Sequence, residues 1–119
     1  LQTEIDTCWA NVGGENPSEY VKKYTGRAPL VHIKDFVGQK SANMYGLIGG
    51  GTTEAAAEEP AVKFELRPVG YGVQDFPAIV KAAEDCGAGW VIVEQDNSYE
   101  TPTLENAKLS REYLKTIYR

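Results

Sequence analysis

Short runs of β-branched and aromatic residues alternate along the chain with segments in which apolar residues recur at helical spacing. The apolar runs predict three strands, over residues 1–6, 29–35 and 90–95, and a short additional strand within 62–70. The second and third strands contain the near-continuous apolar stretches VHI and WVIV. Such stretches are typical of strands that are covered on both faces, as in parallel sheets.

The helical segments begin and end at capping residues. Asn16 followed by Pro17 is an N-cap signal, Asp75 is a second, and Gly87 is a C-terminal stop. A Thr-Pro pair at 101–102 precedes the last segment. These signals predict three helices, over residues 17–24, 76–86 and 104–118. The apolar positions of the last helix are Leu104, Ala107, Leu114 and Ile117.

Strand and helix alternate three times, and this order predicts an α/β fold with a parallel sheet. At 119 residues the chain is long enough for one small domain. Residues 39–60 include the segment GGGTTEAAAEE and predict a mobile insert in that domain. The chain opens with Leu1 and enters a strand pattern at once, which suggests a piece cut from a longer protein, although processing would leave the same start.

Composition narrows the classes of function. The formal net charge is −5 and the sequence has no basic cluster, which argues against nucleic-acid binding. No apolar run is long enough to span a membrane. Cys8 and Cys86 lie far apart without the spacing of a metal site. We therefore expect reduced thiols in a cytoplasmic protein, with a single disulfide as the alternative.

Each predicted strand ends in an ionisable residue. Asp6 ends the first strand, His32 lies near the end of the second, and Glu94 lies at the end of the third. Because the carboxyl ends of parallel strands point the same way, we expect these side chains to converge at one edge of the sheet. Two carboxylates and an imidazole form a plausible set of ligands for a divalent metal. The alternatives are structural: a satisfied core histidine, and carboxylates that cap loops or pair with lysines.

Three other features bear on binding or catalysis, and each gives a weaker signal than the strand ends. The turn GYG, residues 70–72, precedes the second helix and is either an anion-facing turn or a simple tight turn. Trp9 lies three residues after Asp6, where its ring would stack on a sugar or pack under the loop. Cys8 lacks a neighbouring group that would activate it as a nucleophile.

Four segments occur in order along the chain: IDTCW, PLVHIKDF, ELRPVGYGVQDFPAIVKAAEDCGAGWVIVEQD and AKLSREYLK. Together they resemble the C-terminal portion of bacterial sugar phosphate isomerases/epimerases. These belong to the xylose-isomerase-like superfamily, with inosose dehydratase, hydroxypyruvate isomerase and tagatose 3-epimerase. The resemblance covers nearly the whole chain. It implies that residues 1–119 form the last three βα units of a (βα)8 TIM barrel, an incomplete barrel whose N-terminal part is missing from this chain.

The resemblance also implies roles for individual residues. Asp6, His32 and Glu94 match three metal ligands of the family, and a fourth ligand, a glutamate, would fall before Leu1. The expected metal is Mn²⁺, with Mg²⁺ or Co²⁺ as alternatives. Trp9 stands where several relatives carry a second histidine, which argues against the three-zinc site of the endonuclease branch.

The implied chemistry is isomerisation or epimerisation of a sugar or sugar phosphate through an enediolate. Glu94 is the expected catalytic base, and Lys34 is expected to supply a positive charge near the substrate. Asp35 is expected to anchor His32 by hydrogen bonding. The expected substrate-binding residues are Trp9 and Arg67, the latter matching an arginine that meets the substrate in some relatives.

Two alternatives stay open for the complete protein. One is a lyase of the inosose-dehydratase type, in which the same enediolate chemistry expels water. The other is a protein that binds a sugar without turning it over. A homo-oligomer is one expected assembly. The isolated chain is expected to be inactive and to associate or unfold partly, because it lacks one ligand and leaves strand edges unpaired.

Overall fold

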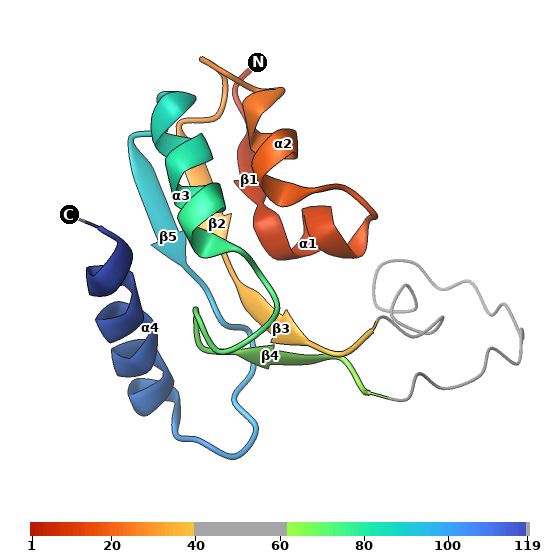
Figure 1. The fold of residues 1–119 in the computed structure, drawn as a ribbon, viewed down its shortest axis with the longest axis vertical. Helices are drawn as coiled ribbons and strands as arrows, with labels where there is room; N and C mark the ends of the chain where they lie inside the picture. Colours follow the sequence, from red (N-terminus) through yellow and green to blue (C-terminus); the bar gives the residue numbers. More distant parts are fainter. Residues whose placement is uncertain (40–61, 119) are drawn as a thin grey trace, which may run out of the picture.

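The computed structural model describes residues 1–39 and 62–118 (Figure 1). The predicted insert therefore falls outside the described residues, except for Gln39. Strands and helices alternate as expected, with a small antiparallel strand pair inserted between the strand and the helix of the second unit. In chain order the elements are β1 (Glu4–Asp6), α1 (Thr7–Val12), α2 (Pro17–Lys22), β2 (Leu30–Ile33), β3 (Asp35–Val37), β4 (Glu65–Arg67), α3 (Phe76–Asp85), β5 (Trp90–Val93) and α4 (Thr103–Ile117).

The central feature is a parallel sheet with the strand order β1-β2-β5. Neighbouring residues of a strand point to opposite faces, so residues in register share a face. One face carries Ile5, Val31 and Val91, which pack into the hydrophobic core. The other face carries, in register, Glu4 with Leu30 and Trp90, and then Asp6 with His32 and Ile92.

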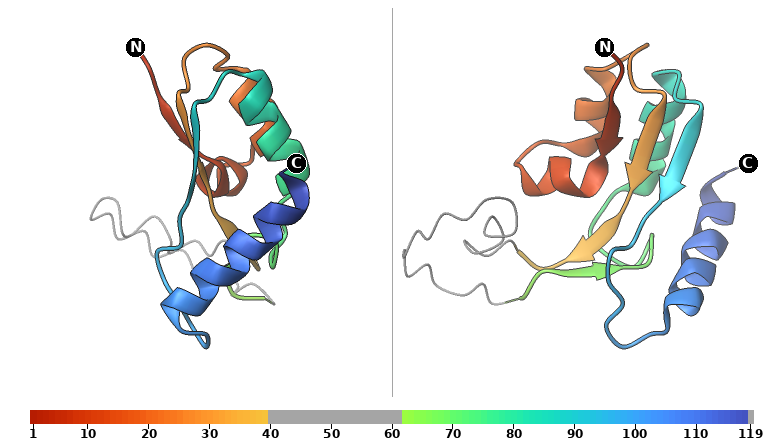
Figure 2. Two further views of the ribbon diagram at one scale, coloured as in Figure 1. Left: turned by 90° about the vertical axis from the view of Figure 1, so that its left-hand side faces the viewer. Right: turned by 180° about the vertical axis from the view of Figure 1, so that it is seen from behind.

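The core lies between the sheet and its helices. In the edge-on view of Figure 2, α3 and α4 lie on the same side of the sheet. Phe76, Ile79 and Ala83 of α3 are buried there against Val21 of α2. The N-caps predicted at Asn16 and Asp75 are confirmed, because each side chain accepts a hydrogen bond from the backbone N–H three residues later. Among residues 1–39 and 62–118, the helices thus cover one face of the sheet.

The hairpin of β3 and β4 differs from the predicted single strand over residues 29–35. The backbone leaves the first sheet at Lys34, and Asp35–Val37 pairs antiparallel with Glu65–Arg67. The extra strand predicted within 62–70 is therefore confirmed, and its partner is β3, which begins at Asp35, the last residue of the second predicted strand. This break directs Lys34 and Asp35 to different surroundings, which matters for the site described below.

Two predictions about helices need correction. Residues 7–12, which lie outside the three predicted helices, form α1, and Asp6 caps this helix by accepting a hydrogen bond from the backbone N–H of Trp9. In α4, Leu114 and Ile117 pack against the core as expected, whereas Leu104 is exposed. The N-terminal half of α4 instead buries Asn106 and Ser110, which hydrogen-bond to neighbouring loops.

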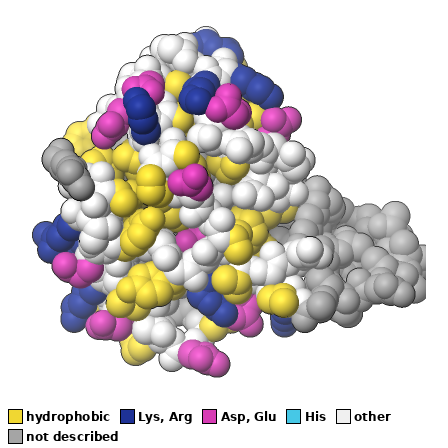
Figure 3. Space-filling view, in the orientation of Figure 1, with side chains coloured by type: hydrophobic (Ala, Val, Ile, Leu, Met, Phe, Trp, Pro, Cys, Tyr) yellow, Lys and Arg dark blue, Asp and Glu magenta, His cyan; other side chains and the backbone are white. Residues whose placement is uncertain are grey.

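The face of the sheet that carries Asp6 and His32 is open. Trp90 is 73% exposed and Ile92 is 37% exposed on this face. The architecture is therefore α/β with parallel strands and outer helices, and the described residues form no closed barrel. On the opposite, helical face, basic and acidic side chains lie side by side toward the edges, with hydrophobic and uncharged surface between them (Figure 3). None of the described helices is long and apolar enough to cross a membrane.

Candidate functional site

Three ionisable side chains meet at the carboxyl ends of the parallel strands. Asp6 and His32 are in register on β1 and β2, and Glu94 follows β5 directly. One potential ligand atom from each lies within 4.8 Å of the other two. The backbone N–H of Glu94 donates to the carbonyl of Ile33 at 3.1 Å, so the sheet itself sets the position of Glu94. The predicted convergence of the three side chains is thus present in the structure.

Lys34 lies at the centre of this cluster, with its side chain almost fully buried. Its Nζ is 2.7 Å from Asp96 Oδ2, 3.2 Å from Asp6 Oδ2 and 3.2 Å from Glu94 Oε2. Burial alone would lower the pKa of Lys34, but its contacts with Asp96, Asp6 and Glu94 outweigh burial and raise the pKa above the ordinary value. Lys34 is therefore a permanent positive charge at neutral pH.

His32 lies between two carboxylates. Its Nδ1 is 2.8 Å from Glu94 Oε2, and its Nε2 contacts Glu4 Oε1. The buried hydroxyl of Thr7 donates to the backbone carbonyl of His32 at 2.9 Å and fixes this end of β2. Sequence analysis missed Glu4 and Thr7. The signal for Glu4 was its position two residues before Asp6 on the same strand, which places both carboxylates on one face.

Asp6 also fulfils the structural alternatives that its sequence position left open. Its Oδ1 accepts the capping hydrogen bond from the N–H of Trp9 at 3.0 Å, and its Oδ2 faces Lys34. The two roles hold the carboxylate in a defined orientation.

The donor set fits a divalent metal. Two carboxylates and one imidazole from Asp6, Glu94 and His32 are oxygen-rich and carry no thiolate, a combination that suits Mn²⁺, Mg²⁺ or Co²⁺. Lys34 and such a metal would use the same carboxylates, because Asp6 and Glu94 both face its ammonium group. The ammonium group of Lys34 therefore offsets the repulsion between the carboxylates of Asp6 and Glu94.

Trp9 lies beside this cluster on α1. Its ring stacks on Phe64, with the ring centroids 5.8 Å apart, and Lys34 Nζ lies 5.5 Å from the centroid of the Trp9 ring. The side chain remains 43% exposed. Trp9 thus packs against Phe64, as one interpretation of its sequence position predicted, and its predicted stacking on a sugar stays a prediction.

Asp35 does not contact His32 as expected. Its fully buried carboxylate accepts hydrogen bonds from four backbone N–H groups, of which three belong to the loop between β4 and α3. The donors are Phe36 at 2.9 Å, Gly70 at 3.0 Å, Gly72 at 2.8 Å and Gln74 at 3.2 Å. The GYG turn is therefore an anion-facing turn whose anion is internal. A Cβ on Gly72 would lie 2.3 Å from Asp35 Oδ1, which explains the glycine there.

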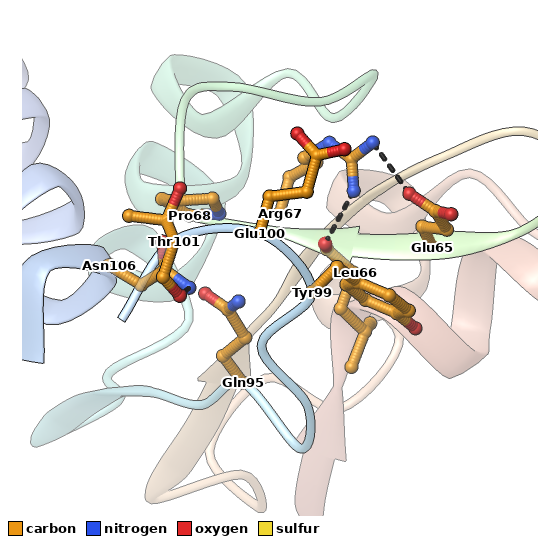
Figure 4. Close-up of a pocket in the computed structure, with 9 residues that line it drawn as sticks. All are labelled: Glu65, Leu66, Arg67, Pro68, Gln95, Tyr99, Glu100, Thr101 and Asn106. Carbon is orange, nitrogen blue, oxygen red and sulfur yellow. Dashed lines mark hydrogen bonds and ion pairs between the residues drawn. The ribbon is translucent and has the colours of Figure 1, made fainter. Parts of the chain in front are cut away.

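Arg67 lies in a separate pocket between β4 and the segment that follows β5 (Figure 4). Its Nη2 is 2.8 Å from Glu65 Oε2, and its guanidinium carbon is 5.9 Å from the ring centroid of Tyr99. The structure does not bring Arg67 into the cluster around Lys34, and its predicted contact with a substrate stays a prediction. The pocket is lined by Glu65, Leu66, Arg67, Pro68, Gln95, Tyr99, Glu100, Thr101 and Asn106.

The two cysteines take no part in the cluster. Both are buried free thiols, so the alternative of a disulfide is not realised. Burial, assisted by the nearby charge of Asp6, raises the pKa of Cys8 to about 12. Cys8 is therefore an unreactive thiol, as its sequence context predicted.

Comparison with known proteins gives three findings. The sequence profile described as "Xylose isomerase-like TIM barrel" matches residues 1–117. Inosose dehydratases from two strains of Clostridium botulinum, Eklund 17B / Type B and Alaska E43 / Type E3, are 35% identical over 117 residues. That match covers 93% of this chain and 36% of each relative.

Among solved structures, a sugar phosphate isomerase/epimerase from Parabacteroides distasonis ATCC 8503 superposes with a TM-score of 0.61 at 26% identity. The superposition covers 96% of this chain and 30% of the other chain. The chain thus spans about a third of the length of the proteins it matches, and its match to the family profile extends over nearly all of its residues. On this evidence the chain belongs to the xylose isomerase-like TIM barrel family.

Proposed function

We propose that this chain supplies the last three βα units of a divalent-metal-dependent isomerase or epimerase that acts on a sugar or sugar phosphate. The observation that carries the proposal is the convergence of Asp6, His32 and Glu94 within 4.8 Å at the ends of adjacent parallel strands. Ligands of barrel enzymes bind at this end of the strands. The similarity to a sugar phosphate isomerase/epimerase supports the choice of reaction and substrate class.

Asp6, His32 and Glu94 would hold the metal, with Mn²⁺ as the first choice and Mg²⁺ or Co²⁺ as alternatives. When bound, a divalent cation polarises a substrate carbonyl and stabilises an enediolate. A complete barrel would add a ligand and the other walls of the site. The proposed substrate is a small polyhydroxylated carbonyl compound, because its vicinal oxygens match a carboxylate-rich metal site.

Glu94 is the residue we propose as the base that moves a proton at the carbon next to the carbonyl. Its side chain is partly exposed at the site, where a substrate can reach it. Lys34 would stabilise negative charge on a substrate oxygen, because its raised pKa keeps it protonated. Trp9 would offer its exposed ring surface to the apolar face of a sugar.

The test is turnover by the complete protein carrying Glu94→Gln, measured by NMR with a panel of free and phosphorylated ketoses and aldoses. We expect turnover to be abolished while substrate binding is largely retained, because glutamine keeps the shape of the side chain and cannot accept the proton. Glu19→Gln is the matched control, since Glu19 is an exposed carboxylate on α2 that pairs with Lys22. Unchanged turnover in Glu94→Gln would contradict the assignment of the base.

A lyase that expels water from an inosose-like substrate is the second candidate. The observation that favours it is the similarity to two inosose dehydratases. Both reactions begin with proton removal next to a carbonyl and differ in the fate of the enediolate. Turnover in D₂O separates them: an isomerase or epimerase returns a sugar of unchanged formula with deuterium at carbon, whereas a lyase releases water and leaves an unsaturated or diketo product.

A further inference from the structure

Glu4 is a carboxylate near the strand ends to which neither the sequence pattern nor the proposed reaction assigns a role. It lies on β1 two residues before Asp6, and its Oε1 contacts Nε2 of His32. The opposite ring nitrogen, Nδ1, faces Glu94 Oε2 at 2.8 Å. The imidazole is therefore held at both nitrogens, with one side toward the group of candidate ligands and the other side toward Glu4.

The position of Glu4 distinguishes it from the candidate ligands. Asp6, His32 and Glu94 each offer an atom within 4.8 Å of the other two, and Glu4 is not a member of that group. In register, Glu4 pairs with Leu30, one same-face position farther from the strand ends than the pair of Asp6 and His32. Glu4 thus contacts the imidazole at Nε2, the ring nitrogen opposite the one that faces Glu94.

Metal-binding histidines generally use one ring nitrogen for the metal and donate the other N–H to a carboxylate, carbonyl or water, which fixes the tautomer and the ring orientation. The backbone of His32 is already held by Thr7 through its carbonyl. Both ring nitrogens face a carboxylate, so the contacts with Glu4 and Glu94 fix the ring orientation. A metal bound at Nδ1 would require the lone pair at that nitrogen and the N–H at Nε2, where Glu4 is placed to accept its hydrogen bond.

We propose that Glu4 is a positioning residue for His32: its carboxylate accepts a hydrogen bond from the Nε2–H and thereby presents Nδ1 as the metal ligand. This inference rests on the proposed metal site and adds to it a residue outside the ligand set. It also explains why a half-exposed glutamate stands at a position of the strand whose register neighbours, Leu30 and Trp90, are apolar.

The test compares Glu4→Ala and Glu4→Gln in the complete protein, with Glu19→Ala as an exposed control on α2. Mn²⁺ affinity is measured by EPR titration, and the His32 ring is observed by ¹⁵N NMR of the Zn²⁺-loaded protein, with the signal assigned from His32→Gln. We expect Glu4→Ala to raise the dissociation constant for Mn²⁺ by about 10- to 100-fold, the range found when such supporting carboxylates are removed. Glu4→Gln should weaken Mn²⁺ binding less, because its amide oxygen can still accept a hydrogen bond from the Nε2–H.

The NMR signal distinguishes positioning from a general effect on folding. In Glu4→Ala, we expect the Nε2–H signal of His32 to shift or to disappear through exchange with solvent. In Glu4→Gln and Glu19→Ala, we expect this signal to be kept. If the unaltered protein binds Mn²⁺ and Glu4→Ala binds it equally well, the inference is wrong while the proposed function stands. Equal losses in Glu4→Ala and Glu4→Gln would identify Glu4 as a ligand and overturn the positioning role. Absence of Mn²⁺ binding by the unaltered protein would overturn the proposed function and this inference together.

Discussion

Lys34 and Asp35 are adjacent, fully buried and oppositely charged, and the protein satisfies them in different ways. Lys34 turns to the open face of the sheet, where all its charged partners are side chains: Asp6, Glu94 and Asp96. Asp35 turns away and accepts four hydrogen bonds from backbone N–H groups. The break in the strand at Lys34, where β2 ends and β3 begins, separates the two environments.

The difference shows which of the two charges can take part in binding. Backbone donors are fixed by the course of the chain, so the contacts of Asp35 hold the β4–α3 loop against the hairpin. Side-chain partners can exchange one cation for another without moving the backbone. A metal would use two of the carboxylates that face Lys34, so Lys34 and its carboxylate partners have the properties of a binding site. Asp35 and its four backbone donors hold the fold together instead.

The strongest test of this contrast is Asp35→Ala in the complete protein. The substitution leaves up to four buried N–H groups without an acceptor, at about 1–3 kcal/mol for each group that stays unsatisfied. We expect a loss of about 4 kcal/mol or more in the free energy of unfolding, measured by urea denaturation. Added Mn²⁺ should not restore it. A loss below about 1 kcal/mol would show that Asp35 does not hold the loop.

Lys34→Met should have the next largest effect. Removing the ammonium leaves three carboxylates facing one another without a cation, and breaking a buried ion pair in this way costs about 3–5 kcal/mol. Unlike Asp35→Ala, this variant should regain stability with Mn²⁺, because a divalent cation replaces the lost charge and binds the folded state. Urea denaturation with and without Mn²⁺ measures both effects. If added Mn²⁺ restored the stability of Asp35→Ala but not that of Lys34→Met, the metal would bind near Asp35 and the proposed roles of the two residues would be reversed.

The contrast also marks the limit of what the sequence could predict. Parallel pairing and the convergence of Asp6, His32 and Glu94 followed from hydrophobic periodicity and from the rule that parallel strands end together. The partner of Asp35 could not be predicted in this way, because it depends on where a loop 35 residues farther along the chain folds back.

Two further misses have local causes. Helix α1 was missed because six residues between a strand and a glycine pair give too short a periodic signal, although Asp6 is a regular N-cap. Arg67 was expected at the site from resemblance alone. In the structure its position depends on the β3–β4 pairing and on Glu65, which the same strand supplies two residues earlier.

A smaller effect is expected from alkaline pH, and its sign follows from the pKa of Lys34. Because the folded state raises that pKa, the contribution of Lys34 to stability is complete below the unfolded value of about 10.4 and is lost as the pH rises toward the folded value. We therefore expect the stability difference between the unaltered protein and Lys34→Met to shrink between about pH 10 and about pH 12. A difference that grows over this range would show that Lys34 is not stabilised as an ammonium ion.

The proposed metal site is tested most directly by a crystal structure of the complete protein grown with Mn²⁺, with anomalous diffraction recorded to locate the metal. We expect one anomalous peak in contact with Asp6, His32 and Glu94, with Lys34 Nζ still on Asp96. The proposed site would be contradicted by a structure in which Lys34 Nζ still lies between Asp6 and Glu94 and the anomalous peak is absent or lies elsewhere.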